Sequence, residues 1–136
     1  MNIGNGIYNI LVNNAGVTAL VGSGANSRIY PLMIPQKAAL PAVIYLMTSC
    51  QPFPTKTGVS SASHYLFDLV CIAETYDGGI ALADAVRSAL DGIKGSKGGI
   101  TFQHIIWQDS RDEAVTIAGI EKFGHTLTFE LRAKES

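Results

Sequence analysis

The chain has 136 residues, the usual size of one domain, and 47% of them are hydrophobic while 15% are charged. This composition excludes an intrinsically disordered chain, and the sparse charge indicates surface that partners cover. The formal net charge of -1 at pH 7 excludes the strong positive field of a dedicated nucleic-acid-binding protein.

A short helix is predicted at the start of the chain, where apolar residues recur at helical spacing. They are Ile3, Ile7, Ile10 and Leu11. Asn2 is the expected N-cap, residues 13–16 the expected end, and residues 17–21 one further turn. Residues 22–27 have the composition of a loop, and residues 28–31 should be extended because Tyr30 precedes a proline.

The first strand is predicted at residues 42–48, an apolar run rich in strand-forming side chains. Such a run suits a strand that is covered on both faces, or one covered by a neighbouring subunit. Residues 51–63 contain Pro52, Pro54, Gly58 and several serines, so we expect a long flexible loop there.

A second strand is predicted at residues 63–73, which alternate with a period of two. One face is expected to carry Tyr65, Phe67, Leu69 and Cys71. The opposite face starts polar with His64 and ends apolar with Ile72, which indicates that one end of this strand leaves the core.

The clearest helix is predicted at residues 76–93, because one face gathers apolar side chains at helical spacing. They are Leu82, Val86, Leu90 and Ile93. Thr75 or Asp77 is expected to cap its start, and the glycine-rich residues 95–99 are expected to form a flexible turn.

Three further segments complete the predicted sheet. Residues 100–108 form a strand in strict alternation, with Ile100, Phe102 and His104 on one face and Ile105 and Trp107 on the other. Residues 109–113 are expected to be a charged connection and residues 114–120 a short strand. Residues 125–132 alternate cleanly, and the tail at residues 133–136 is expected to be frayed.

The order of these elements predicts an α+β fold. We expect a mostly antiparallel sheet of four or five strands with two main helices packed on one face. Residues 1–136 should form a single domain, with residues 51–63 as its long flexible loop. Two cysteines make no disulfide framework, and the N-terminus has no signal-peptide pattern, so we expect folding in a reducing cytoplasm. No apolar run has the length of a membrane helix, so no membrane partner is expected.

Few residues indicate a catalytic or metal-binding site. His64, His104 and His125 lack metal-binding spacing, so a zinc site would need distant histidines to converge with a cysteine. Cys71 is expected in the core. Cys50 with His64 as its base is the one candidate nucleophilic pair, which keeps open the alternative of a small-molecule-binding domain or an enzyme. The favoured interpretation has no catalytic residue, no metal and no cofactor.

Lys94, Lys97 and Arg111 are candidates for contact with DNA or a partner. Lys94 and Lys97 follow a helix, whereas phosphate-binding loops precede one, so a solvated turn is favoured over a nucleic-acid adaptor. Phe53 lies between two prolines, and an apolar ring in a loop needs a cover. It either anchors on a neighbouring subunit or folds back on its own domain.

Several short segments together resemble the small tail completion proteins of tailed phages and prophages, which include tail terminator and head–tail joining proteins. The resemblance covers nearly the whole chain and depends on the order and spacing of the segments. The segments are RIYP at 28–31, PQ at 35–36, LPAVIY at 40–45, AETY at 73–76, ALADAVRSAL at 81–90 and the alternating residues 123–131. The glycine-rich residues 92–99 depart from the pattern.

The resemblance implies a structural α+β subunit without catalysis. Copies would form a ring, a hexamer, that closes the head-proximal end of the tail tube, stops tube growth and offers a surface to the head connector. Genomic DNA would pass through without specific binding, and the protein would be made in a bacterial host and reside in the virion tail. Candidates for contacts between subunits are Tyr45, Phe53, Lys56, His64 and Asp68.

Overall fold

A computed structural model of the chain describes residues 2–24, 27–35, 37–55 and 58–135, with the side chains of residues 52–62 and 135 left outside the description. The described part contains three α-helices, which are α1 (Ile3–Val12), α2 (Ala15–Val21) and α3 (Tyr76–Leu90). It also contains six β-strands, which are β1 (Ile29–Pro31), β2 (Ala42–Thr55), β3 (Gly58–Ala73), β4 (Gly95–Lys97), β5 (Ile100–Ile117) and β6 (Ile120–Glu135).

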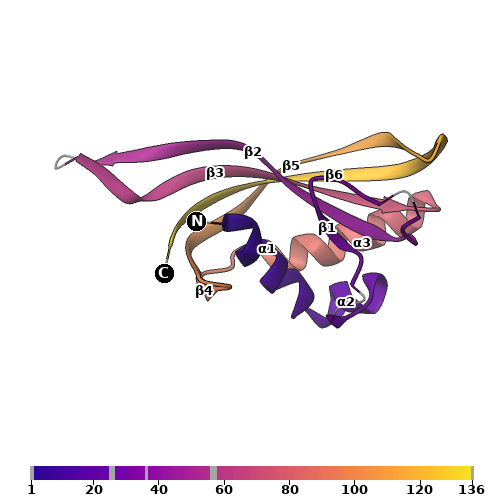
Figure 1. Ribbon diagram of the computed structural model, residues 1–136, viewed down its shortest axis with the longest axis horizontal. Coiled ribbons are helices and arrows are strands. Elements are labelled where there is room, and N and C mark those ends of the chain that lie inside the picture. The colour runs from indigo at the N-terminus through magenta and orange to yellow at the C-terminus, as the bar shows by residue number, and fades with distance from the viewer. Residues whose placement is uncertain (1, 25–26, 36, 56–57, 136) are drawn as a thin grey trace.

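The strands form one curled sheet in the order β1-β2-β3-β6-β5-β4. Only β1 and β2 run parallel, and the other neighbours are antiparallel. The helices pack on one side of the sheet, which we call the inner face, and the opposite side is the outer face (Figure 1). The predicted α+β class with a mostly antiparallel sheet is confirmed, while the numbers of strands and helices are larger than predicted.

Each helix begins at a side chain that accepts a hydrogen bond from an otherwise unpaired backbone N–H. Asn2 Oδ1 accepts from the amide of Asn5 at 3.3 Å, and Thr75 Oγ1 accepts from the amide of Gly78 at 3.0 Å. Asn14 caps α2 through the amide of Val17 at 3.1 Å. The predicted opening helix, its further turn and the helix that starts at residue 76 are therefore confirmed.

The main core lies between the helices and the inner face. The alternation predicted for β3 is confirmed, since its inner-face side chains are buried with those of β6 and the helices. The largest fully buried side chains of this core are Phe102, Phe129, Ile7, Leu11, Leu69, Leu82, Leu90, Ile105 and Leu131, while Ile72 is buried in a second, smaller cluster with Ile44 and Ile117. The main core therefore holds the three helices against the inner face, and the helices do not touch the outer face.

The loop predicted at residues 51–63 is wrong for the described backbone. Both strands continue through this segment as a hairpin, in which Gln51 pairs with His64 and Thr55 pairs with Gly58. A register shift lies between Pro52 and Pro54. Since proline lacks a ladder N–H, an edge strand with a local irregularity is the setting that tolerates it.

The charged connection predicted at residues 109–113 is also wrong, because β5 runs through it without a break. Two register shifts, between Phe102 and His104 and between Trp107 and Asp109, change which side chains face inward. Ile105 therefore joins Phe102 on the inner face, contrary to the strict alternation predicted. The expected turn at residues 95–99 holds the short strand β4, and the tail expected to fray pairs with β5 as far as residue 135.

Candidate interaction surfaces

The outer face carries a polar cluster at its centre. β-sheet register places Asp68 of β3, Thr128 of β6 and Arg111 of β5 within reach of one another. Arg111 donates to Asp68 Oδ2 at 2.9 Å, and the Thr128 hydroxyl donates to Asp68 Oδ1 at 2.7 Å. Asp68 is only 9% exposed, so these partners compensate a largely buried carboxylate and join three strands.

A second outer-face cluster surrounds Glu130 of β6. His64 Nδ1 lies 3.2 Å and His104 Nε2 lies 3.7 Å from Glu130 Oε1, while Gln108 donates to Oε2 at 2.7 Å. The cluster borders a shallow hollow of about 250 Å³. His64 is thus part of a strand-crossing polar network, which leaves its predicted role in a subunit contact untested.

Tyr45 faces the other way, into a hollow of about 540 Å³ beside the start of α1. Burial, and to a smaller extent the neighbouring Tyr8, raise the pKa of Tyr45. β1 pairs with β2 only as far as Tyr45, so the edge of β2 is open from Leu46 onward in the described part of the chain. Leu32 and Met47, which line the hollow beside this edge, are exposed, and so is Met33, the neighbour of Leu32 in the chain. An open strand edge with apolar side chains is a ready site for association.

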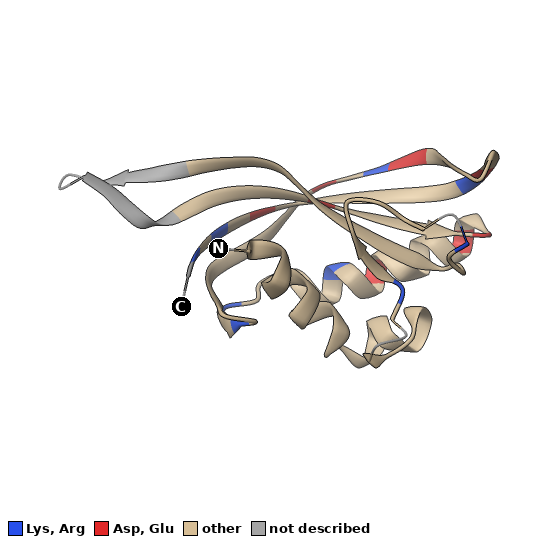
Figure 2. Cartoon of the chain, viewed as in Figure 1, with Lys and Arg blue, Asp and Glu red and all other residues tan. Residues whose placement is uncertain are grey.

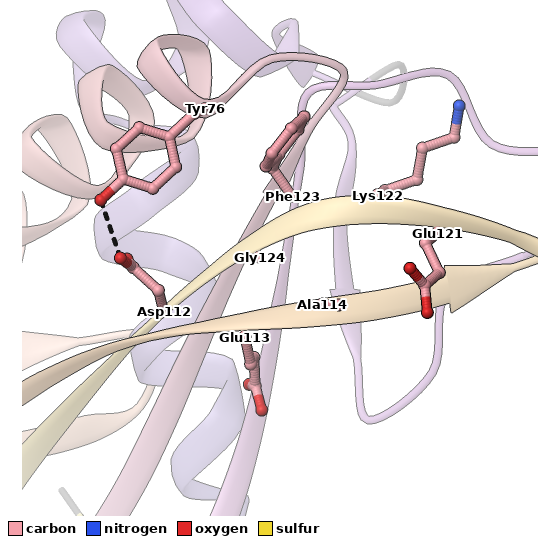
Figure 3. A pocket seen from close by; sticks show the side chains of 8 residues that line it. All are labelled: Tyr76, Asp112, Glu113, Ala114, Glu121, Lys122, Phe123 and Gly124. Atoms are coloured by element: carbon pink, nitrogen blue, oxygen red, sulfur yellow. Dashed lines mark hydrogen bonds between the residues drawn. The ribbon is translucent and has the colours of Figure 1, made fainter.

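An apolar pocket of about 430 Å³ lies where the β5–β6 hairpin passes the start of α3 (Figure 3). Tyr76 and Phe123 meet edge to face there, with ring centroids 6.2 Å apart, and both are 49% exposed. Tyr76 donates to Asp112 Oδ2 at 2.7 Å, and His125 contacts the other oxygen of that carboxylate. We call this the hairpin pocket. Phe123 is half exposed although Tyr76, the first residue of α3, packs against it.

Tyr76→Phe is expected to raise the pKa of Asp112 toward its ordinary value. The hydrogen bond from Tyr76 is the largest cause that holds this pKa low, and the His125 contact comes second. Because the pKa is lowered in the folded state, Asp112 favours folding at neutral pH, and this contribution is lost as pH falls through the lowered pKa. NMR titration of the Asp112 carboxyl measures the change, with Tyr30→Phe as the control. An Asp112 pKa that does not move in Tyr76→Phe would contradict the contact.

The basic residues predicted as DNA or partner contacts are not brought together. Lys94 and Lys97 lie at the β4 edge, and Lys97 pairs with Ile100. Arg111 follows Ile100 by eleven residues on β5, so a strand rise of about 3.3 Å per residue separates it from the lysines by on the order of 30 Å. Arg111 is also engaged with Asp68. Lys94, Lys97 and Arg111 therefore form no single cluster, and their contact with DNA or a partner remains a prediction. Lys56 and the side chain of Phe53 lie outside the described residues.

The Cys50–His64 pair is contradicted as a catalytic site. Cys50 pairs with Tyr65, whose side chain belongs to the inner core, while His64 sits on the outer face beside Glu130. Successive residues of a strand point to opposite faces, so this thiol and this imidazole cannot converge. Cys71 is fully buried, which raises the pKa of its thiol.

Within residues 2–24, 27–35, 37–55 and 58–135, no group of three or more metal-ligating side chains is placed to hold a metal ion. Over the same residues, no helix is both long and apolar enough to cross a membrane.

Two comparisons with known proteins find matches to this chain. The family model described as Tail completion protein gp17 matches residues 5–120 of the chain. Among solved structures, a chain from the virion of a native gene transfer agent particle has a TM-score of 0.67 and 21% sequence identity, covering 96% of this chain and 92% of that chain. At this identity the likeness shows a common fold. A comparison with the curated proteins finds no match.

Proposed function

The chain belongs to the Tail completion protein gp17 family, and from this premise we propose that copies of it form a ring at the head-proximal end of a phage-like tail tube. The protein is a structural component of such a tail and not an enzyme. In the proposed role, the ring stops growth of the tube and presents a surface to the head connector. A hexamer is the assembly that we expect.

The observation that carries this proposal is the family match over residues 5–120. The structure supports it with surface that a single copy leaves uncovered. The edge of β2 is open beyond Tyr45, and exposed apolar side chains gather at this edge and at the hairpin pocket. A closed ring uses two different patches on each subunit, and uncovered apolar surface is what such contacts bury.

The electrostatics suit passage of DNA without specific binding. The net charge is -1, and Arg111 forms an ion pair with Asp68. Each phosphate that a channel neutralises adds salt-dependent affinity, which would hold DNA back. A channel wall with little net charge does not hold DNA back in this way.

The purified chain is expected to form closed rings, either alone at micromolar concentration or when tail tubes are added. Light scattering gives the mass of the assembly, and negative-stain electron microscopy shows its shape and its place on the tube. Tubes grown with the chain present should carry a ring at one end and have a uniform length. Tubes that grow without limit and carry no ring would contradict the proposed role.

A further inference from the structure

The hairpin pocket is an exposed apolar surface that the described part of the chain does not cover. Its aromatic pair, Tyr76 and Phe123, leaves about half of each side chain in solvent. Apolar surface of this kind, rimmed by charges, marks a contact site for another macromolecule. The sign of the charge around the pocket decides which partner fits.

Among the residues that line the pocket, Asp112, Glu113 and Glu121 are acidic and Lys122 is basic. Residues 74–77 and 112–124 include five acidic side chains and one lysine, and they are Glu74, Asp77, Asp112, Glu113, Glu121 and Lys122. Lys122 is ion-paired with Glu74 at 2.7 Å. Asp77 and Glu121 are exposed and form no ion pair with any other described residue. We call residues 74–77 and 112–124 the hairpin end.

The opposite end of the molecule is basic. Residues 94–97 and 131–134 carry Lys94, Lys97, Arg132 and Lys134 and no acidic side chain, with Glu135 next in the chain. Figure 2 shows blue segments on β4 and on the last part of β6, and red segments on the hairpin part of β5 and near the start of α3, with blue segments on the β5–β6 hairpin as well. We call residues 94–97 and 131–134 the β4 end. A chain with 15% charged residues has thus separated much of its charge along its long axis.

These two ends cannot meet within one molecule, since they lie far apart along the sheet (Figure 2). They can meet between two copies. Lysine suits the hairpin pocket because its aliphatic stem covers aromatic rings while its ammonium group reaches the acidic side chains of the lining. Lys94 is exposed and Lys97 half-buried, and neither forms an ion pair with another described residue.

Resting on the proposed ring, we propose that the hairpin pocket receives the β4 end of the next copy of this chain. The contact is heterologous, because each copy offers its hairpin end on one side and its β4 end on the other. Repeating such a contact by rotation closes a ring. Opposite charges at the two ends also oppose the wrong pairings, since two hairpin ends or two β4 ends repel each other.

Charge reversal tests the contact in two variants. The first carries Asp77→Lys with Glu121→Lys, and the second carries Lys94→Glu with Lys97→Glu. Each variant alone should assemble at a concentration roughly tenfold or more higher than the wild-type chain, because like charges then face each other. Mixing the two variants should restore assembly, because the reversed ends complement each other and the unchanged ends do as well. Asp84→Lys, on the exposed side of α3, is the control that should assemble as the wild type does.

The outcomes separate this contact from the ring itself. Wild-type assembly should weaken as salt is added, since screening reduces attraction between exposed charges. If wild type and both variants form rings equally well, the contact is wrong while the ring stands. The same conclusion follows if the variants form rings but lose only their binding to tail tubes, which would assign the pocket to the tube protein. A wild-type chain that forms no ring with or without tubes overturns both proposals. Circular dichroism and Tm verify that each variant folds.

Discussion

Phe129→Ala is expected to lower the free energy of unfolding by about 3–5 kcal/mol, the usual cost of removing a buried phenylalanine ring. Phe129 is completely buried on β6, between Phe67 of β3 and Trp107 of β5 in the register of the sheet. The lost ring leaves a cavity where two strands and the helices meet, and close-packed surroundings relax only partly. Chemical denaturation measures the change, and Tm should fall by roughly 10–20 °C.

Phe123→Ala is the matched control for this prediction. It lies on the same strand and the same face but is 49% exposed, so we expect a loss of less than about 1 kcal/mol. As part of the hairpin pocket, it should instead weaken assembly between copies. Equal losses of stability in the two variants would contradict the difference in burial between Phe129 and Phe123.

The parts of the fold that hydrophobic periodicity specifies were predictable. The alternation of β3 and the spacing of α3 each follow from one buried face, so the sequence pattern and the packing carry the same information. The same holds for Asn2 and Thr75, whose cap positions depend on local backbone chemistry. Local patterns therefore identified the elements on the inner face.

The β2–β3 hairpin was missed because its composition is that of a loop. Pro52, Pro54 and Gly58 are poor strand residues, yet β2 is an edge strand there and the missing proline N–H groups break no second ladder. The two register shifts of β5 were missed for a different reason. The shifts fall at Gln103 and Gln108. A bulge adds one residue to a strand and requires no distinctive side chain, so the sequence at these positions does not indicate that the alternation changes.

The outer-face contacts depend on strand order, which one sequence does not reveal. The sequence indicates Asp68 as a candidate subunit contact and Arg111 as a candidate contact with DNA or a partner, with no relation between the two. They form one ion pair because β6 lies between β3 and β5 and places their side chains on the same face. The hairpin pocket combines residues of α3 and β6 in the same way, and no local pattern links Tyr76 to Phe123.

Gly6→Ala is expected to destabilise the fold although alanine is the better helix former. A Cβ at Gly6 in α1 would lie 2.5 Å from Cζ and 2.6 Å from Cε2 of Phe102. Phe102 is 1% exposed, and its ring is enclosed by the core. The steric cost of about 1–3 kcal/mol should exceed the gain in helix propensity of about 1 kcal/mol, so Tm falls.

Gly79→Ala in α3 is expected to raise Tm instead of lowering it, and this variant serves as the control. Gly79 is also buried, but the nearest atom to its added Cβ is the Cβ of Ala73 at 3.9 Å, an ordinary contact distance. Only the helix-propensity gain of up to about 1 kcal/mol then remains, so Tm rises. If both variants were stabilised, the close approach of α1 to β5 would be wrong. That approach also matters for assembly, because the carbonyl oxygen of Lys97 would lie 3.2 Å from the same added Cβ and the proposed contact needs the β4 end held in place.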